Sequence, residues 1–265
     1  MWSHDNKNCP SPQQLLDFFN KKIEKIRQNT GKCPVQSSLP SASTVTLDSF
    51  KVFSADDIRK TIMNAPSKSC ALDPVPTNTL KEFLPELLPF LTCMCNASLQ
   101  EGYLPTSQRH ALVTPRLKKP GADQTDVINY RPISNLSFIS KIVERLVCQQ
   151  LVSFLEENKL LPNLQSAYRK HHSTETVLLK VVSDILRAAD IGHVSLLCLL
   201  DLSAAFDTVD HNVLIDRLQN SYGLNGTVLS WIKSFVHQRT QSVVVGGGVS
   251  TKSEVKCGVP QGSVQ

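Results

Sequence analysis

The feature that most constrains the fold is a continuous apolar run over residues 194–202, which carries one acidic side chain, Asp201, near its carboxyl end. Its length and its lack of alternation predict a central strand buried on both faces, and it is far too short to span a membrane. A carboxylate in such a place is costly to ionise unless a partner compensates its charge. A bound divalent cation would do so, although capping of the following turn accounts for the same residue equally well.

Around this run, the spacing of apolar residues predicts helices interleaved with a few strands, and therefore an α+β layer fold. Helices are expected over residues 13–28, from 55, from 138 to before 162, over 174–189, from 211 and over 227–236, with a hairpin over 241–256. Ser54, Ser173 and Asp210 are expected to be N-caps, and Ser54 forms a capping-box-like start with Asp57. Frequent prolines predict broken helices over residues 87–99.

Residues 29–49 are rich in Ser, Thr and Pro and predict a linker, so we expect a folded unit to begin near residue 50. The predicted parts are an N-terminal helix and linker over 1–50, a helical segment over 51–108 and the main domain over 109–265. The first helix is expected to be an amphipathic surface helix, with a basic nucleic-acid-binding arm as the alternative.

The 265 residues are 41% hydrophobic and 19% charged, which excludes a disordered or fibrous chain. The net charge of +5 is compatible with nucleic acid without being diagnostic. The eight cysteines form no C-x-x-C pair and predict reduced thiols, neither a disulfide framework nor a zinc site. The polar start lacks a signal peptide, so we expect a soluble intracellular protein, cytoplasmic or nuclear, that does not bind membranes.

Residues 201–211, DLSAAFDTVDH, closely resemble the first catalytic motif of reverse transcriptases from LINE-type non-LTR retrotransposons. Further blocks of that family, in its order, resemble NYRPISNL at 129–136, QSAYRKHHSTET at 165–176 and CGVPQGS at 257–263, and the segment that precedes the polymerase resembles SCALDPVP at 69–76. The resemblance covers roughly residues 50–265. It implies the fingers and part of the palm of a right-hand polymerase that carries out RNA-directed DNA synthesis.

By this resemblance, Asp201 and the backbone carbonyl of Leu202 bind two magnesium ions that act on the primer 3'-hydroxyl and the incoming triphosphate. Asp207 is expected to be a capping or structural carboxylate, not a third ligand. The implied partners are an RNA template, a DNA primer and deoxynucleoside triphosphates.

Lys119 and Arg131 match the fingers cations that hold the triphosphate, and the four basic residues of 109–119 fall in the same region. Phe206 matches the aromatic residue that lies under the sugar and excludes a 2'-hydroxyl. Without the resemblance, these would be surface cations and a core phenylalanine.

Three further residues are assigned by the resemblance. Gln261 and Gly262 match the turn beside the nascent base pair, where glycine permits close approach; alone, this turn reads as a hairpin exit. Arg169 is expected to shape the fingers or to meet the template.

The family's third catalytic block, Ala-Asp-Asp after an aromatic or small residue, has no counterpart after residue 262. Asp56 and Asp57 follow Phe-Ser-Ala, but they precede every other block and are expected to begin a helix. With Asp201 and a carbonyl as the only ligands, we expect a truncated polymerase without appreciable activity. The alternative is a non-catalytic nucleic-acid-binding remnant, and an unrelated enzyme with a strand-end Asp is a third, weaker reading.

Overall fold

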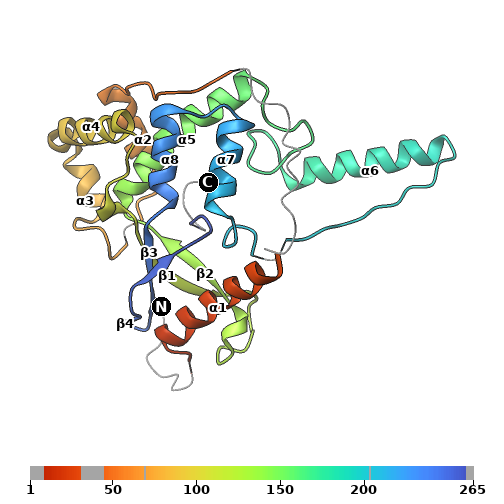
Figure 1. Cartoon of the computed structure of the whole chain (residues 1–265), viewed down its shortest axis with the longest axis horizontal. Helices are drawn as coiled ribbons and strands as arrows, with labels where there is room; N and C mark the ends of the chain where they lie inside the picture. The colour runs from red at the N-terminus through yellow and green to blue at the C-terminus, as the bar shows by residue number, and fades with distance from the viewer. Residues whose placement is uncertain (1–8, 31–44, 69, 203, 261–265) are drawn as a thin grey trace.

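The structure is a computed structural model that describes residues 9–30, 45–68, 70–202 and 204–260. A five-stranded sheet forms one part of it, and helices form the rest (Figure 1). The strands are β1 (His110–Leu117), β2 (Tyr130–Asn135), β3 (Arg239–Val245), β4 (Gly248–Val249) and β5 (Ser253–Val255). Their order is β2-β1-β3-β4, with β5 also paired to β3. Mixed α and β structure, as the sequence predicts, is therefore confirmed.

The register of the sheet decides which side chains share a face. β1 and β2 are antiparallel, with Arg116 opposite Arg131 and Leu117 opposite Tyr130. β1 and β3 are parallel, whereas β4 and β5 each pair antiparallel with β3. Because successive side chains of a strand point to opposite faces, Tyr130 and Arg131 lie on different sides of the sheet.

Five helices of ten or more residues contribute buried side chains to the larger apolar cluster, which includes Ile58, Leu99, Leu146 and Val228. They are α2 (Ala55–Asn64), α4 (Leu84–Glu101), α5 (Phe138–Glu157), α7 (His211–Asn220) and α8 (Gly226–Val236). Shorter elements are α3 (Thr77–Glu82) and the 3-10 turns η1 (Thr106–Gln108) and η2 (Val127–Asn129). None of the helices in the described ranges is both long and apolar enough to cross a membrane.

Helix α4 corrects one prediction, because it runs unbroken through the region expected to hold broken helices. Pro85 lies in the first turn, where a backbone N–H has no acceptor within the helix. Pro89 removes one further hydrogen bond, and burial of Leu84, Cys95 and Leu99 stabilises the helix around it.

Local signals identified three helix starts correctly. Ser54 and Asp57 form a full capping box at α2, and the side chain of Asp210 accepts hydrogen bonds from the first turn of α7. Ser173 caps α6 (Thr174–Asp190), the helix predicted over 174–189. The hairpin predicted over 241–256 is also confirmed, although β4 and β5 divide its second arm.

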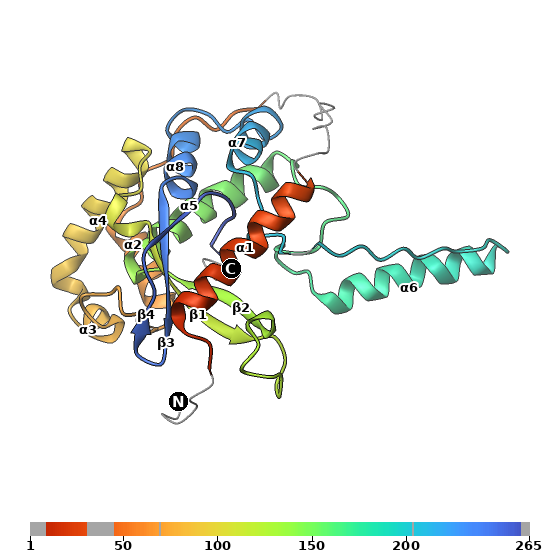
Figure 2. The same ribbon diagram turned by 60° about the horizontal axis from the view of Figure 1, so that its bottom comes forward.

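Helix α1 (Pro12–Thr30) confirms the prediction of an amphipathic helix and lies across the sheet (Figure 2). Its buried side chains pack against strand residues from three strands. The cluster consists of Leu15, Leu16, Phe19, Val113, Tyr130 and Val243. The N-terminal helix is thus packed onto the sheet, and the boundaries of the three predicted parts stay a prediction.

The apolar run over 194–202 is not a strand, which is the main correction to the sequence-based picture. It is an extended segment that returns from α6, and the two project from the body (Figure 1). Leu196 is 96% and Leu200 91% exposed, and α6 has no buried residue. A strand needs a hydrogen-bonding neighbour and cover for its faces, and the described residues offer this segment neither.

Candidate functional site

Asp201 lies in this exposed segment, next to the turn that carries Phe206. Both residues, with Leu202 and Asp207, line one open depression of the surface. The predicted position at the end of a buried strand is therefore wrong, while Asp201, Leu202 and Phe206 all line the same depression. The depression brings a carboxylate, a backbone carbonyl and an aromatic ring to one place.

The residues of the depression do not fit a site for two magnesium ions. Asp201 and the carbonyl of Leu202 supply only two ligands, and magnesium prefers six oxygens. Burial raises the pKa of the Asp207 carboxyl, which Lys22 partly counteracts, so Asp207 is a poorer ligand than an exposed carboxylate. Within the described ranges, no three His, Cys, Asp or Glu side chains are grouped to hold a metal ion.

Phe206 is held by its backbone in a tight turn. Ala204 has a φ of 54°, and its carbonyl accepts hydrogen bonds from Asp207 N at 3.0 Å and Thr208 N at 3.2 Å. The carbonyl of Phe206 accepts a hydrogen bond of 2.8 Å from Val259 N. The turn after Asp201 is thus joined directly to the residues that precede Gln261.

Gly258 allows the turn after Asp201 and the segment before Gln261 to approach each other closely. Its N–H donates to the Val209 carbonyl at 2.8 Å, and its carbonyl accepts a hydrogen bond of 2.7 Å from His211 Nε2. At its φ of 85°, a Cβ atom would lie 2.6 Å from the Asp207 carbonyl oxygen. Only glycine satisfies both the conformation and the space at this position.

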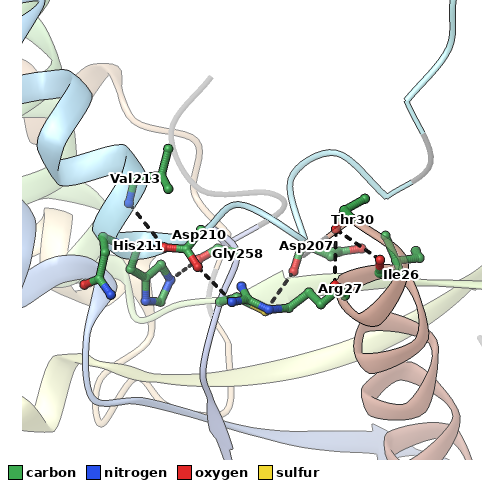
Figure 3. A network of polar contacts seen from close by, with 10 residues as sticks. Ile26, Arg27, Thr30, Asp207, Asp210, His211, Val213 and Gly258 are labelled. Atoms are coloured by element: carbon green, nitrogen blue, oxygen red, sulfur yellow. Dashed lines mark hydrogen bonds and ion pairs between the residues drawn. The ribbon is translucent and has the colours of Figure 1, made fainter. Parts of the chain in front are cut away.

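A polar network ties α1 to the same segment (Figure 3). Arg27 Nη2 lies 2.8 Å from Asp210 Oδ2, while Asp210 Oδ1 accepts from Asn212 N and Val213 N. The hydrogen bond from Arg27 and those from the α7 backbone lower the pKa of Asp210. Arg27 therefore fixes the N-cap of the helix that follows Asp201 and Phe206 in the chain.

Arg131 lies in β2 with an exposed side chain, directly opposite Arg116 of β1. Neither guanidinium forms an ion pair or hydrogen bond with any residue that the structure describes. Like charges opposite each other destabilise a strand pair, and an anion placed between them would relieve this. Lys119, also exposed, lies in the turn after β1.

One cation of the basic stretch is unavailable to a ligand. Arg109 is 3% exposed, its guanidinium lies 4.4 Å from the centre of the Tyr103 ring, and its Nε donates to the Leu104 carbonyl. Of the four basic residues of 109–119, which fall in the region expected to hold the triphosphate, Arg109 is therefore buried away from any ligand. Its aliphatic stem and planar head favour burial against an aromatic ring.

Arg169 is tied to its own loop, because Nη1 lies 3.2 Å from the carbonyls of both Pro162 and Gln165. This agrees with a role in shaping the loop, and no contact in the described part of the chain speaks for the template role. Gln261 and Gly262 lie outside the described residues.

Sequence reasoning missed three residues that the structure brings to these sites. Arg116 lies opposite Arg131 across β1 and β2, but neither strand is predicted from the sequence, so this pairing was missed. Tyr168 contacts the ring of Phe206, and Arg27 pairs with Asp210. Both contacts join segments that are distant in the sequence, so no local pattern predicts them.

A family model described as reverse transcriptase (RNA-dependent DNA polymerase) matches residues 117–265, more than half of the chain. The chain therefore belongs to the reverse transcriptase family. The match includes Lys119, Arg131, Asp201 and Phe206. Members of this family depend in general on divalent metal ions.

Within the family, the chain is similar to polymerases of LINE-type non-LTR retrotransposons. It is 32% identical to the RNA-directed DNA polymerase from mobile element jockey of Drosophila melanogaster, over 87% of the chain and 24% of that protein. The jockey polymerase of Drosophila funebris is also 32% identical, over 97% of the chain and 28% of that protein. The Transposon TX1 uncharacterized 149 kDa protein of Xenopus laevis is 28% identical over 78% of the chain and 16% of that protein. The chain thus spans about a quarter of the length of its jockey relatives.

Proposed function

We propose that this chain provides the nucleotide-binding part of a retrotransposon RNA-directed DNA polymerase, which transfers nucleotides to a primer 3'-hydroxyl. The observation that carries the proposal is the family match over 117–265, which contains the exposed cation Arg131 and the ring of Phe206. The names of the jockey relatives support the same activity. Arg131, Arg116 and Lys119 would bind the triphosphate, and Phe206 would face the sugar.

Removal of the Arg131 charge tests this proposal. We expect Arg131→Gln to weaken binding of a fluorescent deoxynucleoside triphosphate about tenfold or more, because a charge-assisted hydrogen bond to phosphate is lost. Arg59→Gln is the matched control, since Arg59 is an exposed arginine of α2 whose partner is Asp56. Equal affinities of the two variants would contradict the assignment of Arg131.

We expect the chain to bind nucleotides without adding them to a primer. Asp201 and the Leu202 carbonyl are too few ligands for two metal ions, so we expect the purified 265-residue chain not to extend a primer on an RNA template. The measurement is a primer-extension assay with magnesium. Template-directed incorporation by the chain would show that this ligand count is wrong.

A second candidate, nucleic-acid binding without chemistry, is favoured by the same short ligand set and by Arg116 and Arg131, which have no ion-pair partner among the described residues. Binding through phosphate contacts weakens with salt, because counterions compete for the phosphates. We expect the affinity for single-stranded RNA to fall between low and moderate salt. The same affinity at both salt concentrations would count against a phosphate-bound complex.

A further inference from the structure

An aromatic pair joins two family blocks that are far apart in the chain. The rings of Tyr168 and Phe206 have centroids 6.1 Å apart and an interplanar angle of 88°. This is the edge-to-face arrangement that aromatic side chains prefer. Tyr168 is 71% and Phe206 43% exposed, so the contact is not part of an apolar core.

The backbone on both sides holds the rings in this arrangement. Phe206 is fixed by the turn at Ala204 and by the hydrogen bond from Val259 N. Tyr168 has a φ of 62°, which is uncommon for a residue other than glycine, Asn or Asp. The hydrogen bonds from Arg169 to the carbonyls of its own loop stabilise the loop on which Tyr168 lies.

Only one of the two rings faces the depression. Phe206 lines the depression that also contains Asp201, whereas Tyr168 does not line it. Tyr168 therefore contacts the Phe206 ring from outside the depression. Loss of Tyr168 would leave the Phe206 ring free to change rotamer, and the space it fills beside a bound sugar would no longer be fixed.

We propose that Tyr168 is a positioning residue for sugar selection: it holds the Phe206 ring where that ring excludes a 2'-hydroxyl. This rests on the proposed function, in which Phe206 faces the sugar of the nucleotide. Tyr168 acts only through the second ring and does not touch the ligand. An aromatic pair of this kind changes an equilibrium constant by about two- to tenfold, which sets the expected effect.

The test is the ratio of the affinities for dATP and ATP, measured on the 265-residue chain by competition with a fluorescent deoxynucleotide. We expect Tyr168→Ala to lower the preference for dATP about two- to tenfold and Tyr168→Phe to leave it unchanged. The tyrosine hydroxyl has no hydrogen-bond partner among the described residues, so Phe retains the whole contact. Alanine meets the same backbone restriction as tyrosine, so the substitution removes the ring alone.

Two further variants separate positioning from general damage. Phe206→Ala is expected to lower the preference as much as the double variant Tyr168→Ala/Phe206→Ala does, because Tyr168 has nothing left to position. Leu164→Ala, in the same loop and 89% exposed, is expected to behave like the wild type. A wild-type preference for dATP that persists in Tyr168→Ala would overturn the inference and leave the proposed function intact. A wild-type chain that binds neither nucleotide would overturn both.

Discussion

Gly258 lies where the turn before Pro260 touches the segment that follows Asp201. Its positive φ and the nearby Asp207 carbonyl mean that any side chain would force the two segments apart. We expect Gly258→Ala to lower the free energy of unfolding by about 2–4 kcal/mol, because it adds a steric clash to the cost of a left-handed conformation.

Gly247 is the matched control, because its φ is 83° and a Cβ atom there would meet nothing within 4 Å. Gly247→Ala should therefore lower the free energy of unfolding only by the cost of the left-handed conformation, about 1 kcal/mol. Urea unfolding followed by circular dichroism measures both variants. Equal losses would mean that the Asp207 carbonyl does not approach Gly258 closely.

His211 makes stability depend on pH. Burial lowers its pKa, and the ring of His237 lies 5.1 Å away, although the hydrogen bond to Gly258 opposes the shift. Because the pKa is lower in the folded chain, the unfolded chain binds more protons as the pH falls. The stabilisation is complete above the ordinary histidine pKa of about 6.5 and decreases as the pH falls below it.

We therefore expect the midpoint of urea unfolding to fall between pH 7 and pH 5.5, and to fall less in His211→Gln, which keeps a hydrogen-bond donor. The raised pKa of Asp207 acts in the opposite direction, so the informative quantity is the difference between wild type and variant. Parallel pH profiles for the two proteins would exclude His211 as the cause.

At the scale of elements, α1 connects the sheet, the β3–β5 hairpin and the segment after Asp201. Phe19 is 4% exposed in the cluster with Val113 and Val243, whereas Phe18 packs only at its margin. We expect Phe19→Ala to cost about 3–5 kcal/mol and Phe18→Ala clearly less, because a cavity forms only at the buried position. Thermal and urea unfolding of the two variants provide the comparison, and similar losses would contradict the packing of α1 on the sheet.

How much of these elements could be predicted from the sequence depends on the range of the interactions that form them. The N-caps Ser54, Ser173 and Asp210 act within one helical turn, and all three were predicted correctly. The contact of α1 with β3 and the pair of Tyr168 with Phe206 depend on tertiary packing, which leaves no periodic signal. The run over 194–202 has a strand-like pattern, but a pattern does not supply the neighbouring strand.

At the scale of the whole molecule, α6 and residues 194–202 form an exposed apolar arm. Such surface promotes association, and an extended segment has unpaired backbone groups along its length. We expect the purified chain to self-associate as its concentration rises, and the double variant Leu196→Lys/Leu200→Glu to reduce this. Sedimentation velocity measures the effect, with Leu164→Lys as an exposed control outside the arm. Equal association of both variants would exclude the arm as its cause.

The position of α1 on the sheet also dictates an order of events during synthesis. α1 is synthesised well before its partners: Arg27 and Asp210 are 183 residues apart, and Gln13 and Thr251 are 238 apart. β1 likewise cannot pair with β3 until much later in synthesis, since His110 and Thr240 are separated by 130 residues. Long-range pairings of this kind fold slowly. The nascent chain therefore presents Leu15, Leu16 and Phe19 without their full cover until β3 and the hairpin have emerged.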